Sequence, residues 1–170
     1  MTHFEMHPSN GLIYFEHGDG SLYRSGDRIK TYDTNSGEIK IYIDRPGGAT
    51  NPRLSPDGKK LAYIHRDDRQ TVLVIHDIYS KEEKVINRQL DFDRQDSGSF
   101  YGSYPNLAWH PNGREVFVTY NGGIHGIKVA NGNVRNIEFE ALVDRDVKNT
   151  IRFKVDIPQE LVTTRSHRWS

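Results

Sequence analysis

The sequence predicts an all-β fold, a fragment of a β-propeller with about three four-stranded blades and extra strands at its C-terminal end. One motif occurs three times, as FEMHPSNGLIYFE, PRLSPDGKKLAYIH and LAWHPNGREVFVTY. Each copy joins an apolar or aromatic residue to a proline-centred turn and an alternating apolar strand. The turn prolines Pro8, Pro56 and Pro111 are 48 and 55 residues apart, close to the ~40–50 residues of one four-stranded blade. A hydrophobic fraction of only 35%, with 15 Gly and 7 Pro, suits thin sheets joined by many turns.

The middle copy gives the clearest blade. Residues 52–54 predict a short inner strand, and Ser55-Pro56-Asp57-Gly58 predicts a turn, because Pro presets φ and Asp and Gly accept the conformations that follow. Apolar and β-branched runs then predict strands at 61–64, 71–77 and 84–86.

The other two copies follow the same plan. In the third copy the expected strands lie between turn signals at His110-Pro111-Asn112-Gly113, Asn121-Gly122-Gly123 and Asn131-Gly132, at residues 108–109, 115–120, 124–129 and 134–137. In the first copy they lie at residues 12–15, 21–33 with a bulge or small loop at 25–27, and 39–43.

These elements predict one partial propeller domain spanning residues 1–170. The blades are expected at about 1–44, 50–88 and 103–138, and further strands in the tail at 150–170. Because a repeat cannot bury its face alone, three blades would leave two apolar faces open. We therefore expect self-association through the open blade faces, or a remainder of the polypeptide that covers them. The alternative is that the tail strands form a fourth blade and close a small ring within one chain.

The composition argues against several classes of function. Lys and Arg number 23, as do Asp and Glu, so the chain lacks the basic excess typical of nucleic-acid binders. The absence of cysteine excludes disulfides, thiolate metal sites and cysteine nucleophiles. No apolar run approaches the ~18 residues of a membrane span, and the N-terminus lacks signal-peptide features. We expect neither a nucleic-acid nor a membrane partner, and the compartment stays open.

A long polar and aromatic loop, residues 89–104, is the strongest candidate for a binding surface, because loops of this length are uncommon unless functional or disordered. It carries Asp91, Asp93 and Asp96, whose oxygens could bind a hard cation, and Tyr101 and Tyr104, which could stack on a ligand. The aspartate spacing does not match the helix–loop–helix calcium motif, so a solvated acidic loop is the favoured interpretation. We predict binding residues here but no metal site and no cofactor.

No catalytic residue is predicted. His65, His76 and His125 lie on expected strands, where histidine is usually hydrogen-bonded in place, although one poised with an Asp could act as an acid–base pair. Trp109 is expected in the core between blades.

With these residues laid out, the chain resembles known families. SPDGKKLAYI is similar to the turn and strand of TolB-type propellers. The longer strings from Arg45 to Ser170, including RPGGATNPRLSPDGKKLAYIHRDDRQTVLVIHDI and IRFKVDIPQELVTTRSHRWS, resemble the propeller region of large amidohydrolases, which join such a propeller to a metal-dependent hydrolase barrel. The resemblance implies a parent that is periplasmic or secreted. The His-x-His pair that begins the family's metal site is absent, so no metal ligand or catalytic carboxylate can be carried over.

The leading hypothesis is a non-catalytic binding or scaffold module, a piece of an amidohydrolase-type hydrolase without its hydrolase domain. The alternatives are a stand-alone propeller hydrolase with an axial site and a TolB-like module that binds envelope proteins.

Overall fold

The computed structural model describes residues 4–17, 27–92 and 106–147, and these contain strands but no helix. The chain divides into two units, residues 1–139 and 140–170. All the described strands belong to the first unit, and residues 140–147 of the second have no regular secondary structure. No described helix could span a membrane.

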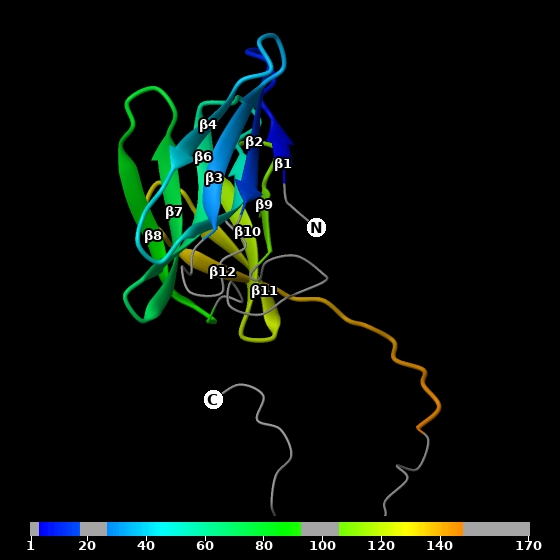
Figure 1. The fold of residues 1–170 in the computed structure, drawn as a ribbon. Helices are drawn as coiled ribbons and strands as arrows, with labels where there is room; N and C mark the ends of the chain where they lie inside the picture. Colours follow the sequence, from blue (N-terminus) through cyan, green and yellow to red (C-terminus); the bar gives the residue numbers. More distant parts are fainter. Residues whose placement is uncertain (1–3, 18–26, 93–105, 148–170) are drawn as a thin grey trace, which may run out of the picture. The chain divides into compact units, whose positions relative to one another are not determined.

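Twelve described strands form three four-stranded antiparallel sheets (Figure 1). Blade 1 consists of β1 (Phe4–Met6), β2 (Leu12–His17), β3 (Arg28–Asp33) and β4 (Ile39–Ile43). Blade 2 consists of β5 (Ala49–Leu54), β6 (Lys60–Asp67), β7 (Gln70–Asp77) and β8 (Glu83–Leu90). Blade 3 consists of β9 (Leu107–Trp109), β10 (Glu115–Tyr120), β11 (Gly123–Lys128) and β12 (Val134–Ile137). Within each sheet, strands adjacent in sequence are adjacent in space, so each blade is a meander. The predicted all-β class and the three blades are confirmed.

The repeated proline turn has the same backbone bonding in all three blades. The amide of the residue before the proline donates to the carbonyl five residues later: His7 to Leu12, Ser55 to Lys60 and His110 to Glu115, at 2.8, 2.8 and 3.0 Å. This common closure fixes equivalent positions in the three blades.

The blades bury their faces on one another. Strand side chains alternate between the two faces, so Leu61 and Tyr63 of β6 lie in the core shared with blade 1, whereas Ala62 and Ile64 lie in the core shared with blade 3. All four are fully buried. Blade 2 is therefore covered on both faces, which explains why its strands are the most continuously apolar of the chain.

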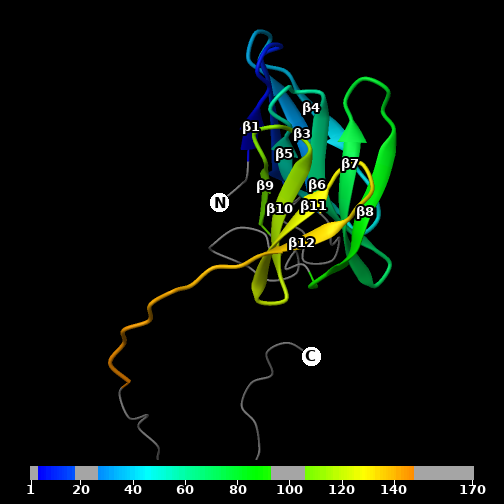
Figure 2. The ribbon, with the colours of Figure 1, turned by 180° about the vertical axis from the view of Figure 1, so that it is seen from behind.

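The short strands β1, β5 and β9 are the inner strands of their blades and lie beside one another, with contacts between β1 and β5 and between β5 and β9 (Figure 2). Their neighbourhood is the part of the fold that places side chains from three blades together.

Three strands of blade 2 are clearly longer than the sequence predicted. β5 begins at Ala49 rather than Pro52, β6 runs from Lys60 to Asp67 rather than from 61 to 64, and β8 runs from Glu83 to Leu90 rather than from 84 to 86. Polar residues hid the extensions of β5 and β8, because Thr50 and Asn51 are buried in the first and Asn87 is buried in the second. The expected bulge at 25–27 falls almost wholly outside the described residues, as do the tail strands at 150–170, and the blade limits stay predictions.

Candidate functional site

A pocket of about 480 Å³ opens where the inner strands meet the proline turns. Its lining comes from all three blades: Glu5 of β1, Arg53 and Leu54 of β5, and Leu107 and Trp109 of β9. The repeat places one side chain of each inner strand at the same position, because Glu5, Arg53 and Ala108 pair with equivalent residues of the second strands. The pocket is thus a product of blade stacking and not of any single blade.

Arg53 is the central side chain of this site. Its Nη1 donates to Glu5 Oε1 at 2.9 Å, its Nε to the Leu107 carbonyl at 3.0 Å, and its Nη2 to Asn106 Oδ1 at 3.5 Å. The guanidinium therefore connects the inner strands of blades 1 and 3 from its place on blade 2. Only 19% of the side chain is exposed, so its hydrogen bonds are partly shielded from water.

Trp109 forms one wall of the pocket. Its indole Nε1 donates to the Arg53 carbonyl at 2.8 Å, and its ring packs against the core between blades 2 and 3, as the sequence predicted. Because the indole N–H is engaged, the ring is fixed in place and offers a rigid apolar surface beside a charged pair. Such a site can bind a ligand with both polar and apolar parts.

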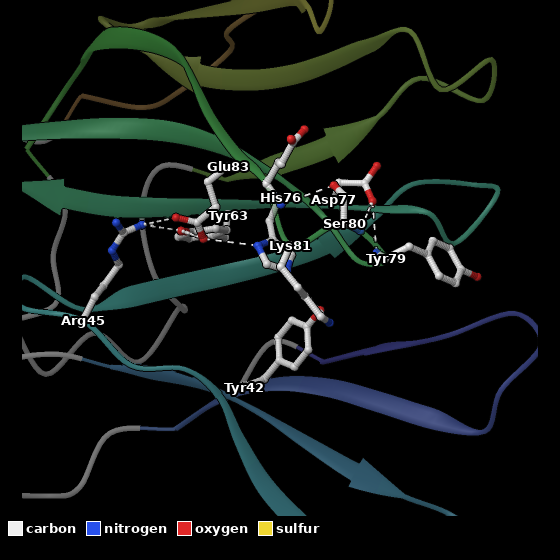
Figure 3. A network of polar contacts seen from close by, with 10 residues as sticks. Tyr42, Arg45, Tyr63, His76, Asp77, Tyr79, Ser80, Lys81 and Glu83 are labelled. Carbon is white, nitrogen blue, oxygen red and sulfur yellow. Dashed lines mark hydrogen bonds and ion pairs between the residues drawn. The ribbon is translucent and has the colours of Figure 1, made fainter.

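A second polar group joins blade 1 to blade 2 (Figure 3). Arg45 Nη1 donates to the Tyr63 hydroxyl at 2.6 Å and to Glu83 Oε2 at 2.9 Å, and Tyr63 donates to Glu83 Oε1 at 2.8 Å. His76 Nδ1 lies 3.2 Å from Glu83 Oε1. We call these four residues, together with Tyr42, the inter-blade clamp.

The clamp continues to the outer strand of blade 1. Tyr42 Oη lies 3.1 Å from His76 Nε2, and Lys81 Nζ donates to the same hydroxyl at 2.9 Å. A neutral His76 satisfies every contact: its Nδ1–H donates to Glu83, and its Nε2 accepts from the Tyr42 hydroxyl. The hydrogen bonds thus assign the tautomer of this ring.

Burial and charge set the protonation states of the clamp. Burial lowers the pKa of His76, which keeps the ring neutral, and burial together with the hydrogen bond to Glu83 raises the pKa of Tyr63. Burial alone would raise the pKa of Glu83, but the Tyr63 hydroxyl and the positive charge of Arg45 outweigh it and lower that pKa. The clamp therefore holds one carboxylate between one permanent cation and neutral donors, an arrangement suited to joining blades.

This arrangement predicts a stability loss on mild acidification. Because the folded-state pKa of His76 lies below its unfolded value, the unfolded chain binds more protons, and stability falls as pH falls from above ~6.5 toward the folded pKa, by at most about 1.4 kcal/mol per pH unit for one histidine. His76→Gln should flatten this slope in urea unfolding measured between neutral and mildly acidic pH. The slope that remains is assigned to His65, whose pKa burial also lowers. The exposed His17→Gln serves as the control. An unchanged slope in His76→Gln would contradict the neutral-histidine assignment.

Of the residues predicted to bind a ligand, the structure describes Asp91 alone. Its Oδ2 accepts a hydrogen bond of 2.6 Å from the Asn121 amide, so it connects the end of β8 to the turn between β10 and β11. Asn121 has a φ of 47°, and the carboxylate satisfies the amide of this left-handed residue. Asp93, Asp96, Tyr101 and Tyr104 lie outside the described residues, so the binding role of this loop stays a prediction.

The three strand histidines have different partners. His65 Nδ1 contacts the Gly48 carbonyl at 2.8 Å, and His125 contacts Asn136 Oδ1 and the Tyr120 carbonyl. His76 pairs with Glu83 instead of with an Asp. Within residues 4–17, 27–92 and 106–147, no three potential ligands among His, Asp and Glu are grouped as a metal site.

Sequence reasoning missed Arg53, Glu5 and every clamp residue except His76. Their positions in the repeat contained a signal, since Glu5 and Arg53 occupy equivalent places in successive inner strands, but only the stacking of blades brings them within bonding distance.

No protein-family model matches the chain. The Tol-Pal system protein TolB of Histophilus somni is 34% identical over 71 residues, which are 42% of this chain and 15% of that protein. The crystal structure of TolB from Acinetobacter baumannii matches with a TM-score of 0.59 and 16% identity, over 79% of this chain and 32% of that one. The Pyrococcus horikoshii acylaminoacyl peptidase matches with a TM-score of 0.53 and 14% identity, over 81% and 25%.

The matches cover well under half of each of these proteins, and the structural identities are low enough that they show the fold alone. Three stacked meanders, the shared proline turn and these matches all indicate the same fold. The chain has a TolB-like β-propeller fold.

Proposed function

We propose that this chain is a non-catalytic binding module that holds an extended segment of a partner protein in the pocket between its inner strands. The observation that carries the proposal is Arg53, whose guanidinium joins three blades at the pocket. Arg has five N–H donors, and three bonds to described residues are accounted for. A partner carbonyl or carboxylate could accept from those that remain, while an apolar side chain packs on Trp109.

A TolB-like propeller fold is consistent with protein interaction, and the arrangement of the pocket supports binding over chemistry. Its charged groups, Arg53 and Glu5, are paired with each other, so neither is poised as a base or nucleophile. Glu5 also gives the site its selectivity, because a partner carboxylate would have to compete with it for Arg53.

The finer proposal is that this module belongs to an amidohydrolase-type hydrolase, where it would lie beside the hydrolase barrel and screen substrate access. The strings from Arg45 to Ser170 that resemble such proteins support it. Genomic DNA on both sides of the coding region tests it: an open frame that encodes a further Pro-Asp-Gly turn and a His-x-His pair supports the proposal, whereas a stop codon directly after Ser170 contradicts it.

A second candidate is a TolB-like module that binds envelope proteins, which the match to the Histophilus somni protein favours. Both candidates need a binding surface, and they differ in the partner.

We expect Arg53→Ala to weaken the binding of such a peptide strongly relative to the native chain. Extended peptides with a free C-terminal carboxylate and an aromatic residue would be titrated while Trp109 fluorescence is followed, in a Trp169→Phe background that leaves Trp109 as the sole tryptophan. The matched control is Arg88→Ala, which removes an exposed arginine paired with Asp67 away from the pocket.

A loss of affinity of about tenfold or more in Arg53→Ala alone is expected, equal to the ~1.4 kcal/mol of one charge-assisted hydrogen bond. Equal affinities of the two variants would contradict the placement of the site. Hydrolysis of generic ester, peptide or amide substrates by the purified chain would instead support the stand-alone enzyme.

A further inference from the structure

Blade 1 presents an apolar face on the side away from blade 2. Two cross-strand rows make up this rear face: Phe4, Phe15, Lys30 and Ile41 in one, and Met6, Ile13, Tyr32 and Ile39 in the other. Four of these side chains are largely exposed, namely Phe4 at 68%, Met6 at 63%, Ile39 at 59% and Ile41 at 58%. Tyr14, in the alternate row, faces blade 2 and is buried.

Together these four side chains expose on the order of 500 Å² of apolar surface, taking roughly 200 Å² for each side chain. That is about as large as the largest patch on a typical monomer, and larger patches usually mark interaction sites. It is also more than half of the ~800 Å² that each partner contributes to a standard interface.

Blade 3 exposes the face that, in blades 1 and 2, packs on the next blade. On the side away from blade 2 it carries a row of Ala108, Phe117, Gly126 and Arg135, and beside it Thr119, Ile124 and Ile137. Phe117, Ile124 and Ile137 are only half-buried, whereas the equivalent Ala62 and Leu73 of blade 2 are fully buried under blade 3. We call this the forward face.

The two interfaces inside the chain show how a forward face meets a rear face. His7 Nε2 of blade 1 lies 2.9 Å from the Gly58 carbonyl in the blade 2 turn, and Lys84 Nζ of blade 2 donates to the Ala130 carbonyl in the outer turn of blade 3. Blades 1 and 2 thus each place a side-chain nitrogen within hydrogen-bond distance of a turn carbonyl in the next blade.

Blade 3 repeats both forward donors. His110 occupies the position of His7, and its Nδ1 accepts from the backbone amide two residues on, at 3.1 Å, as His7 Nδ1 does at 3.3 Å. Arg135 occupies the position of Lys84 in its cross-strand row. Asn10 of blade 1 is equivalent to Gly58 of blade 2, and Asn35 of blade 1 is equivalent to Ala130 of blade 3. If a blade 1 followed blade 3, His110 would therefore contact the Asn10 carbonyl, and Arg135 would contact the Asn35 carbonyl.

We propose that a second copy of this chain covers these faces, with the forward face of blade 3 in each copy packed on the rear face of blade 1 in the other. Because the same chain supplies both members of the contact, two copies related by a two-fold axis form the interface twice. The result is a closed six-bladed ring, within the range of 4–8 blades of natural propellers. His110 then donates to the second copy's Asn10 carbonyl and Arg135 to its Asn35 carbonyl. This proposal depends on the fold and not on the ligand of the pocket, so either can fail alone.

Sedimentation at micromolar concentration tests the proposal, with Ile41→Lys on the rear face, Phe117→Lys on the forward face, and Tyr79→Lys as a control in an exposed turn outside both faces. The native chain and the control should sediment at twice the 19.6 kDa chain mass, and each face variant as a monomer with unchanged circular dichroism. An equimolar mixture of the two face variants should recover dimer, because one native interface remains in the mixed pair.

A native monomer would overturn the proposal and assign the faces to blades of a longer polypeptide. A Phe117→Lys variant that stays dimeric would also overturn it, since a dimer formed by two rear faces would not involve Phe117.

Discussion

Gly47→Ala should destabilise the protein by roughly 2–5 kcal/mol, from about 1–2 for the left-handed backbone and about 1–3 for overpacking. Gly47 lies between β4 and β5 with a φ of 83°, and a Cβ there would come 2.0 Å from the Arg66 carbonyl oxygen. The obstacle is backbone, so it cannot move aside by a change of rotamer. Urea unfolding monitored by circular dichroism gives the comparison.

Gly37→Ala is the matched control for this experiment. Gly37 has a similar φ of 74°, but no atom lies within 4 Å of its added Cβ, so only the backbone cost of about 1–2 kcal/mol applies. The difference between the two variants isolates the close approach of blade 2 to the connection between the blades. Equal losses of stability in both variants would mean that the Arg66 carbonyl does not lie close to Gly47.

Glu83→Ala should cost about 1–3 kcal/mol. The side chain is only 31% exposed, and its removal leaves Arg45, the Tyr63 hydroxyl and His76 Nδ1 without their shared acceptor. Loss of one partner of a fully buried pair costs about 3–5 kcal/mol, and partial solvent screening reduces that figure here. The lost stability should come from the contact between blades 1 and 2.

The comparison variant is Glu38→Ala, whose ion pair with Lys40 is exposed and should contribute less than about 0.5 kcal/mol. Because the folded-state pKa of Glu83 is lowered, the stability that it contributes is present above its unfolded pKa and is lost as pH falls through the folded value. Glu83→Ala should therefore also weaken acid destabilisation. A loss as small as that of Glu38→Ala would exclude the clamp as a stabilising contact.

The repeat made most of the fold predictable. Proline turns and alternation of apolar residues act over a few residues, so Leu61 to Ile64 and Glu115 to Tyr120 could be placed as strands from local sequence. The extension of β5 to Ala49 could not, because Thr50 and Asn51 look like loop residues. The structure buries both beside Glu16, which accepts hydrogen bonds from the Thr50 hydroxyl and the Asn51 amide.

The candidate site was less predictable for a related reason. Arg53 bonds with Glu5 and Leu107, residues 48 and 54 positions away, and such contacts exist only once blades are stacked. Local patterns favoured the long loop at 89–104 instead, since its length and its polar and aromatic composition stand out. Asp91 is the one residue predicted there that the structure describes, and its carboxylate accepts a hydrogen bond from the Asn121 amide in a turn.

Proton NMR can show whether the three meanders stack as successive blades. Stacking should give nuclear Overhauser contacts between the Trp109 indole N–H and the Arg53 backbone, and between the His7 ring and Gly58, pairs that are 56 and 51 residues apart. A spectrum that contains the strand pairings within each sheet but lacks both of these contacts would contradict it.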